Sequence, residues 1–245
     1  MTVLSRKLYP VISNETRGMS KTRIAILDYG LGNIRSIRNA LIHQGGNPLV
    51  TRNEDDILEA SGLILPGVGA FPHGMKNLND YGLVPVIEKY VATGKPVMGI
   101  CLGMQMLMEF SEEHHRCEGL GFISGGVKKL PFQLSEDKRL PHVGWKKIMP
   151  PIGNTWEEGI LKSLSLDPFY YFVHSYAACP KFSENAYAWT EDGGMKFASA
   201  VRHGNVFGFQ FHPEKSGLAG LVILRNFLMK CEENISTYSS RNEIG

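Results

Sequence analysis

Two short motifs of this 245-residue chain contain three side chains with complementary chemistry. Cys101 lies at the centre of GICLG, residues 99–103, and His212 and Glu214 lie in QFHPE, residues 210–214. A cysteine attacks an acyl carbon as the thiolate, so it needs a base beside it, and a histidine oriented by a carboxylate is such a base. These residue types predict nucleophilic acyl chemistry, provided that the fold brings the two motifs together.

The sequence around Cys101 predicts a sharp turn from a strand into a helix. Residues 96–100 form an apolar run typical of a buried strand, and residues 102–110 have the pattern of a helix. A nucleophile at such a turn adopts strained backbone angles, and Gly99 and Gly103 leave room for strand and helix to approach each other. The alternative is that Cys101 is an ordinary buried core cysteine.

The sequence around His212 and Glu214 alternates between aromatic and other residues, which predicts a strand. If residues 206–214 continue as a strand, His212 and Glu214 project to the same side, and Pro213 between them ends the regular pairing. Glu214 can then orient one imidazole nitrogen and leave the other for the thiol. The alternative is a surface histidine and glutamate at the end of a strand.

A third motif, LPGVG at residues 65–69, follows another predicted strand. Its two glycines allow a tight turn that can direct main-chain N–H groups into a cleft. Acyl transfer needs such donors near the developing oxyanion. We therefore expect the backbone amides of Val68, Gly69 and Leu102 to form an oxyanion hole.

Short apolar runs alternate with segments of helical periodicity in the first half of the chain. Residues 23–27, 47–51, 62–66 and 96–100 predict strands, and residues 34–44 predict a crossover helix. This alternation is typical of a parallel sheet covered by helices.

After Gly119 the sequence favours strands joined in hairpins, because aromatic and β-branched residues alternate with glycine-rich turns. The predicted strands are residues 169–176, 186–190, 196–203 and 205–212, and residues 218–231 predict a closing helix. We expect a single α/β domain with a mixed, mostly parallel central sheet flanked by helices. It spans residues 23–231, between a poorly ordered extension at 1–22, in which Met19 could be a start, and a tail at 232–245.

Composition argues against several other classes of protein. The 26 basic and 24 acidic residues give a net charge of +2, and the sequence has no basic stripe that would suggest nucleic acid. No apolar run approaches the roughly 20 residues that cross a bilayer. The four cysteines follow no tight spacing, which suits a reducing, cytoplasmic compartment. His114, His115 and Cys117 are expected to be exposed loop residues rather than metal ligands.

Taken together, the motifs resemble those of the class I, triad-type glutamine amidotransferases, over residues 23–231. The best match is narrower: six segments are similar to the glutaminase subunits of imidazole glycerol phosphate synthase. They are DYGLGN, LPGVGAF, GICLGMQML, PHVGW, FVHSY and QFHPEKSG, at residues 28–33, 65–71, 99–107, 141–145, 172–176 and 210–217.

The resemblance implies that Cys101, His212 and Glu214 hydrolyse glutamine through a thioester, with no metal or organic cofactor. It also implies a glutamine pocket lined by Gly69, Gln105, Glu113, Ser175 and Tyr176. The ammonia would pass to a partner chain, a (β/α)₈-barrel cyclase, in a heterodimer. Positions that match the docking face are Asn33, Ser36, His142, Trp145 and Lys215.

One position departs from the family pattern and keeps alternatives open. Lys146 follows PHVGW, where family members usually carry asparagine. A paralogous glutaminase that serves an amidotransferase of surface-polysaccharide sugar biosynthesis is therefore an alternative. An inactive scaffold subunit, or a cysteine hydrolase that acts on something other than glutamine, is a further one.

Overall fold

A computed structural model describes residues 22–130, 141–153, 155–157, 159–164 and 168–242, with side chains up to residue 234. The predicted extension at residues 1–22 lies outside the described residues, except for Thr22. Among the described helices, none combines the length and apolar character that a membrane span requires.

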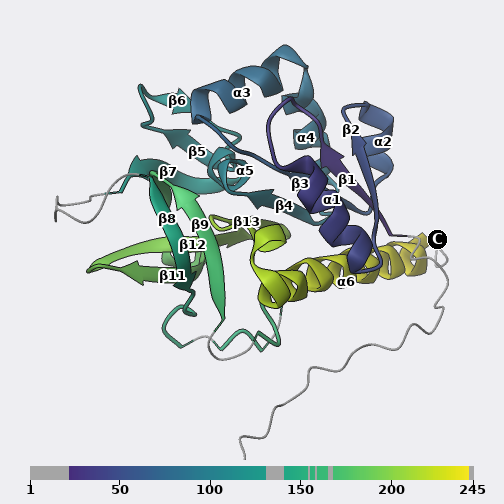
Figure 1. Cartoon of the computed structure of the whole chain (residues 1–245). Helices are drawn as coiled ribbons and strands as arrows, with labels where there is room; N and C mark the ends of the chain where they lie inside the picture. Colours follow the sequence, from purple (N-terminus) through teal and green to yellow (C-terminus); the bar gives the residue numbers. More distant parts are fainter. Residues whose placement is uncertain (1–21, 131–140, 154, 158, 165–167, 243–245) are drawn as a thin grey trace, which may run out of the picture.

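The central sheet has seven strands in the order β11-β12-β13-β4-β3-β1-β2 (Figure 1). The pairs from β13 to β2 are parallel, whereas β12 pairs antiparallel with both β11 and β13. The predicted mixed, mostly parallel sheet is therefore confirmed. The strands are β1 (Arg23–Leu27), β2 (Asn47–Thr51), β3 (Gly62–Leu65), β4 (Val97–Ile100), β11 (Ala186–Asp192), β12 (Met195–His203) and β13 (Val206–Phe209).

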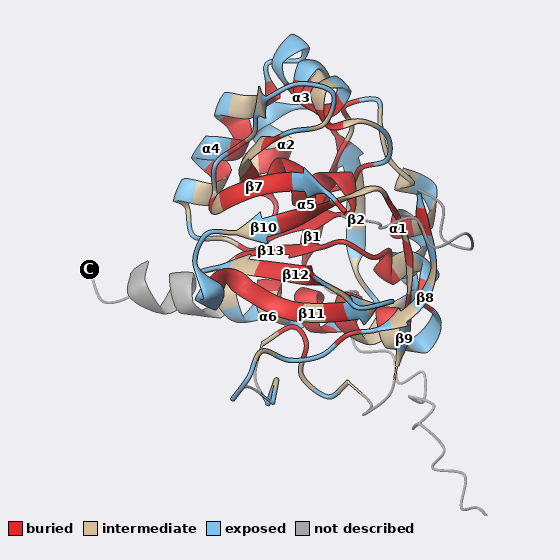
Figure 2. Ribbon diagram, turned by 90° about the vertical axis from the view of Figure 1, so that its left-hand side faces the viewer, coloured by how far each residue is buried: buried red, intermediate tan, exposed pale blue. Residues whose placement is uncertain are grey.

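Helices cover both faces of this sheet, because successive strand residues point to opposite sides. In β1, Ile24 and Ile26 pack with α1 and α6, whereas Ala25 and Leu27 pack under α2 to α5. Figure 2 shows the strands buried between helices whose outer sides are exposed. The helices are α1 (Ile34–His43), α2 (Glu54–Glu59), α3 (Phe71–Asp80), α4 (Leu83–Ala92), α5 (Leu102–Met106) and α6 (Gly217–Asn242).

Two smaller sheets lie beside the central one and were not predicted as separate units. The first has the order β10-β7-β5-β6, and the second is the antiparallel pair β8-β9. Their strands are β5 (Met108–Ser111), β6 (Cys117–Glu118), β7 (Ile123–Lys129), β8 (His142–Lys147), β9 (Phe169–His174) and β10 (Tyr176–Pro180). Two short 3₁₀ turns, η1 (Ser183–Asn185) and η2 (Pro213–Lys215), complete the described elements.

The predicted helix at residues 102–110 is wrong in its second half. α5 ends at Met106, and β5 begins at Met108. The backbone carbonyl groups of Met106 and Met108 accept hydrogen bonds from Leu120 and Gly121, and β5 pairs with β6 and β7. Pairing with a distant segment thus overrides the local helical pattern.

Two other predicted boundaries also change. The run at residues 169–176 divides between β9 and β10, which belong to different sheets. The closing helix does not end at residue 231, because α6 continues to Asn242 through most of the predicted tail.

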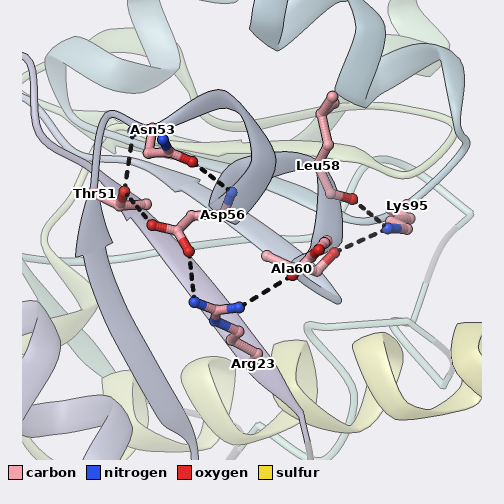
Figure 3. A network of polar contacts seen from close by, with 8 residues as sticks. Arg23, Thr51, Asn53, Asp56, Leu58, Ala60 and Lys95 are labelled. Carbon is pink, nitrogen blue, oxygen red and sulfur yellow. Dashed lines mark hydrogen bonds and ion pairs between the residues drawn. The ribbon is translucent and has the colours of Figure 1, made fainter.

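A polar network fixes α2 against the edge of the central sheet (Figure 3). The Asn53 side chain accepts a hydrogen bond from the Asp56 amide and caps the helix N-terminus. The Asp56 carboxylate in turn accepts hydrogen bonds from Arg23 at 2.7 Å and from Thr51 at 3.0 Å. These contacts tie α2 to both β1 and β2.

The other end of α2 is held by Lys95. Its ammonium group donates to the carbonyl groups of Leu58, at 2.7 Å, and Ala60, at 3.1 Å. Carbonyl groups at a helix C-terminus lack partners within the helix, so a cation there is favourable. Burial lowers the pKa of Lys95, with an opposing contribution from Glu59.

Candidate active site

The three sequence motifs meet where the inner strands of the central sheet reach their carboxyl ends. They follow β3, β4 and β13, which are neighbouring parallel strands, so their carboxyl ends lie side by side (Figure 1). A cleft of about 430 Å³ opens at these carboxyl ends. It is lined by Val68, Gly69, Cys101, Leu102, Gln105, Glu113, Pro141, Val173, His174, Ser175, Tyr176 and His212.

Cys101 occupies a strained turn between β4 and α5. Its backbone angles are φ +56° and ψ −110°, outside the regions that residues with a side chain ordinarily adopt. Its amide donates to the carbonyl group of Phe209 at 2.7 Å, which ties the turn to the end of β13. The predicted sharp turn at this position is therefore confirmed.

The glycines on either side of Cys101 are required by close packing. A Cβ atom on Gly99 would lie 2.7 Å from the backbone of Gly103. A Cβ atom on Gly103 would overlap the carbonyl oxygen of Leu65. Because these neighbours are backbone atoms, α5 could not stay this close to β3 and β4 with larger residues at either position.

His212 and Glu214 form a buried pair behind the sulfur. Nδ1 of His212 lies 2.9 Å from Oε1 of Glu214, and the exposed fractions of the two side chains are 2% and 0%. Asn33 also donates to this carboxylate oxygen, at 3.3 Å. The carboxylate therefore holds the imidazole in one orientation.

The route by which Glu214 reaches His212 differs from the prediction. β13 ends at Phe209, and Glu214 lies in the 3₁₀ turn η2 rather than in a continued strand. The Ser216 hydroxyl donates to the carbonyl oxygen of His212 at 2.6 Å and closes this turn. A tight turn, not strand alternation, thus brings carboxylate and imidazole together.

The surroundings of His212 favour its charged form. Burial by itself lowers the pKa of His212, but Cys101 and Glu214 outweigh burial and raise the pKa to about 9. Among the described residues, Nε2 of His212 has no hydrogen-bond partner other than the sulfur of Cys101. The imidazole can therefore hold a proton beside the sulfur and give it to a group bound in the cleft.

A second histidine at the cleft, His174, has the opposite character and was not singled out from the sequence. Burial, with smaller contributions from the neighbouring His142 and His212, lowers its pKa to about 3. Nδ1 of His174 lies 2.8 Å from the carbonyl oxygen of Tyr176, so Nδ1 carries the proton of the neutral ring. Its position in FVHSY, a segment used for the resemblance, was the available signal.

The residues expected to bind substrate all line the cleft. One carboxylate oxygen of Glu113 accepts a hydrogen bond from the amide of Phe71 at 2.7 Å, at the start of α3. Nε2 of Gln105 donates to Tyr176 and to Gln210. These contacts fix both side chains before any ligand binds.

The expected oxyanion donors also line the cleft. Among the described residues, no acceptor takes the amide protons of Val68 and Gly69. Gly69 has φ +105°, a conformation that favours glycine. This loop therefore has two N–H groups without an acceptor among the described residues, in the lining of the cleft that also contains Cys101.

Four of the five residues matched to a docking face lie at least partly at the surface. Trp145 is 51% exposed, Lys215 is exposed, and Asn33 and Ser36 are half-buried. Lys215 lies over the ring of Tyr171, with 5.7 Å from Nζ to the ring centroid.

The prediction that His142 belongs to the docking face is wrong. Its side chain is only 4% exposed and packs against the rings of Phe172, His174 and Phe197. Its Nε2 atom lies 2.9 Å from Oδ2 of Asp192. The side chain of His142 is therefore part of the interior and offers no surface to a partner.

Lys146, the departure from the family pattern, pairs within its own chain. Its Nζ atom lies 2.8 Å from Oδ1 of Asp192, and its side chain is 33% exposed. The sequence could not predict this partner, which lies 46 positions away.

Comparisons with known proteins agree with this geometry. Residues 25–231 match the family model described as glutamine amidotransferase class-I. The chain belongs to the class I glutamine amidotransferase family. Solved structures have the same fold. This protein has a TM-score of 0.63 to the crystal structure of a glutamine amidotransferase, at 21% sequence identity, and the match covers 85% of this chain and 98% of that chain. A chain in the structure of PurLQS from Thermotoga maritima also has a TM-score of 0.63 to this protein. The two are 20% identical, and the match covers 87% of this chain and 98% of that chain.

Curated relatives of the amidotransferase carry the name imidazole glycerol phosphate synthase subunit HisH. The protein of Methanosarcina barkeri (strain Fusaro) is 46% identical over 211 residues, which are 85% of this chain and 99% of that protein. The protein of Bacillus cereus (strain B4264) is 45% identical over 209 residues, which are 83% of this chain and 93% of that protein. The protein of Aquifex aeolicus is 42% identical over 215 residues, which are 86% of this chain and 98% of that protein.

Proposed function

We propose that this chain is the glutaminase subunit of an imidazole glycerol phosphate synthase. It hydrolyses glutamine, and a cyclase subunit uses the ammonia to make imidazole glycerol phosphate in histidine biosynthesis. One observation carries the proposal: Cys101, His212 and Glu214 meet at a cleft in a chain that is 42–46% identical, over most of its length, to HisH subunits.

In the first half of the reaction, the thiolate of Cys101 attacks the side-chain amide carbon of glutamine. The carbonyl oxygen becomes an oxyanion and receives hydrogen bonds from the amides of Val68, Gly69 and Leu102. His212 gives its Nε2 proton to the amide nitrogen as the C–N bond breaks, so ammonia leaves and a thioester remains.

In the second half, water hydrolyses the thioester. His212, now neutral, takes a proton from the water as its oxygen attacks the acyl carbon, and the C–S bond then breaks. Glutamate leaves and Cys101 regains its thiolate beside the imidazolium. Glu214 stabilises the charged imidazole in each half, because it accepts the Nδ1–H bond in a dry environment.

The substrate pocket suits one free amino acid. We assign binding of glutamine to Gly69, Gln105, Glu113, Ser175 and Tyr176, which line the cleft together with Cys101. The carboxylate of Glu113 suits the ammonium group of the substrate. No metal or organic cofactor enters these steps.

The proposed partner is a (β/α)₈-barrel cyclase in a heterodimer, docked near Asn33, Ser36, Trp145 and Lys215. Ammonia released into neutral water becomes ammonium, which has no lone pair for attack, so the two sites need a sheltered connection. Lys146 gives no reason to prefer the sugar-pathway partner, because its charge is paired with Asp192 in this chain. We place the enzyme in the cytoplasm, with no nucleic-acid or membrane partner, and its domain at residues 23–231.

The test is glutamate release from glutamine, measured for the chain alone and with the cyclase and its ligand. We expect low activity alone and a rise in the complex. Cys101→Ala should abolish glutamine-dependent synthesis but leave synthesis from added ammonium salts, because the cyclase needs only ammonia. Glutaminase activity retained by Cys101→Ala would contradict the proposal.

A further inference from the structure

The buried side chain of Gln210 connects the sulfur of Cys101 to a chain of hydrogen bonds. Gln210 is 0% exposed, and its Nε2 atom lies 3.9 Å from Sγ of Cys101. Its Oε1 atom lies 3.1 Å from Nε2 of Gln105, which is also 3.0 Å from the carbonyl oxygen of Tyr176. Two side-chain amides thus link the backbone of β10 to the nucleophile.

The direction of these hydrogen bonds follows from Tyr176. A backbone carbonyl oxygen can only accept, so the group of Gln105 that faces it is the NH₂ group. The same NH₂ group faces Gln210, which must therefore present its carbonyl oxygen there. The NH₂ group of Gln210 is left facing the sulfur. One backbone carbonyl in this way determines the orientation of both amides.

We propose that Gln210 is a positioning residue that donates a hydrogen bond to the sulfur of Cys101 and favours its thiolate form. Gln105 holds the amide of Gln210 in the donating orientation. This inference rests on the proposed role of Cys101 as the nucleophile. A charged acceptor strengthens a hydrogen bond, so the contact stabilises thiolate more than thiol.

A further polar neighbour of the sulfur, the carbonyl group of Val173, cannot play this role. The carbonyl oxygen of Val173 lies 3.9 Å from Sγ and can accept a proton from a thiol, but it has nothing to donate to a thiolate. Deprotonation of Cys101 therefore removes the contact with Val173 and strengthens the contact with Gln210.

The same network limits what Gln105 can do for the substrate. Both of its N–H groups are used, by Tyr176 and Gln210. Only its carbonyl oxygen is free to contact glutamine, so Gln105 acts toward substrate as an acceptor.

The experiment measures the rate at which iodoacetamide alkylates Cys101 as a function of pH in the full chain without substrate. The modified peptide is read by mass spectrometry, so that Cys117 and Cys179 do not interfere. Gln210→Met keeps a side chain of similar length and removes the donor. A hydrogen bond to a charged group corresponds to roughly one to two pH units, and the long separation favours the lower end. We expect the midpoint of the profile to rise by about one pH unit.

Two further variants make the result specific. Gln210→Glu should raise the midpoint further than Gln210→Met, because a carboxylate repels the thiolate; this variant also serves if the methionine variant does not fold. Ser199→Ala is the matched control. Ser199 is 0% exposed, its carbonyl accepts the Gln210 amide, and its hydroxyl has no partner among the described residues. Its midpoint should stay at the wild-type value.

A folded Gln210→Met variant with the wild-type midpoint would overturn the inference, as would an equal shift in Ser199→Ala. Failure of the proposed function looks different, because glutamate release would then not depend on Cys101 at all. Glutaminase activity that needs Cys101, together with an unmoved midpoint in Gln210→Met, would leave the function standing and remove only the role of Gln210.

Discussion

Replacement of His174 by asparagine should make the protein less sensitive to acid. The His174 imidazole is buried between His142, Phe172 and Phe197, and its pKa is lowered from 6.5 to about 3. The unfolded chain binds a proton at this position below about pH 6.5, whereas the folded chain stays neutral there. Stability is therefore lost as the pH falls from 6.5 toward 3, and none is lost above this range.

The size of the effect follows from proton linkage. Each pH unit in this window lowers the free energy of unfolding by about 1.4 kcal/mol per group. A change from about pH 7 to about pH 4.5 therefore lowers it by roughly 2–3 kcal/mol through His174. The assay is urea unfolding of wild type and His174→Asn at both pH values. The variant loses packing at every pH, so the quantity to compare is the change with pH, which should be smaller in the variant by roughly 2–3 kcal/mol.

His174→Gln serves as a second variant without a titrating ring, and it should behave like His174→Asn. Nuclear magnetic resonance of the wild-type ring supplies an independent check, because His174 should remain neutral at about pH 5. Equal pH dependence in wild type and both variants, or a protonated His174 ring at that pH, would refute the reasoning.

The remaining predictions use other parts of the site. Cys101→Ala should lower the pKa of His212 from about 9, because burial remains while the contribution of the sulfur is lost; titration of the ring by nuclear magnetic resonance would show an unchanged value if this is wrong. Gly103→Ala should destabilise the fold by about 1–3 kcal/mol or more in urea unfolding, because its Cβ overlaps backbone. Gly144→Ala is the control, with only a side-chain atom 3.7 Å away, and an equal loss there would contradict the steric explanation. Lys146→Asn should change cyclase binding less than tenfold in a titration of purified subunits, since a partly exposed ion pair contributes about 0–1 kcal/mol. If Lys146→Asn bound the cyclase tightly and the wild type did not, the sugar-pathway partner would be favoured instead.

Features that depend on near neighbours in the chain could be predicted from the amino-acid sequence. The apolar run before Cys101 and the glycines beside it were enough to predict a sharp turn, because backbone freedom and side-chain size act locally. The alternation of short apolar runs and helical segments was enough to predict a mostly parallel sheet. That the three motifs share one site was implied by their resemblance to the class I glutamine amidotransferases, not by the pattern of any one motif.

Features that depend on distant segments follow from the three-dimensional fold and could not be predicted in this way. Pairing with β6 and β7 ends α5 at Met106, and the turn η2 rather than a strand places Glu214. Burial decides that His142 belongs to the interior, and Asp192 decides where the charge of Lys146 lies. The contact between Gln210 and the sulfur joins positions 109 apart in the sequence. Such contacts depend on how segments pack in three dimensions, which local residue patterns do not encode.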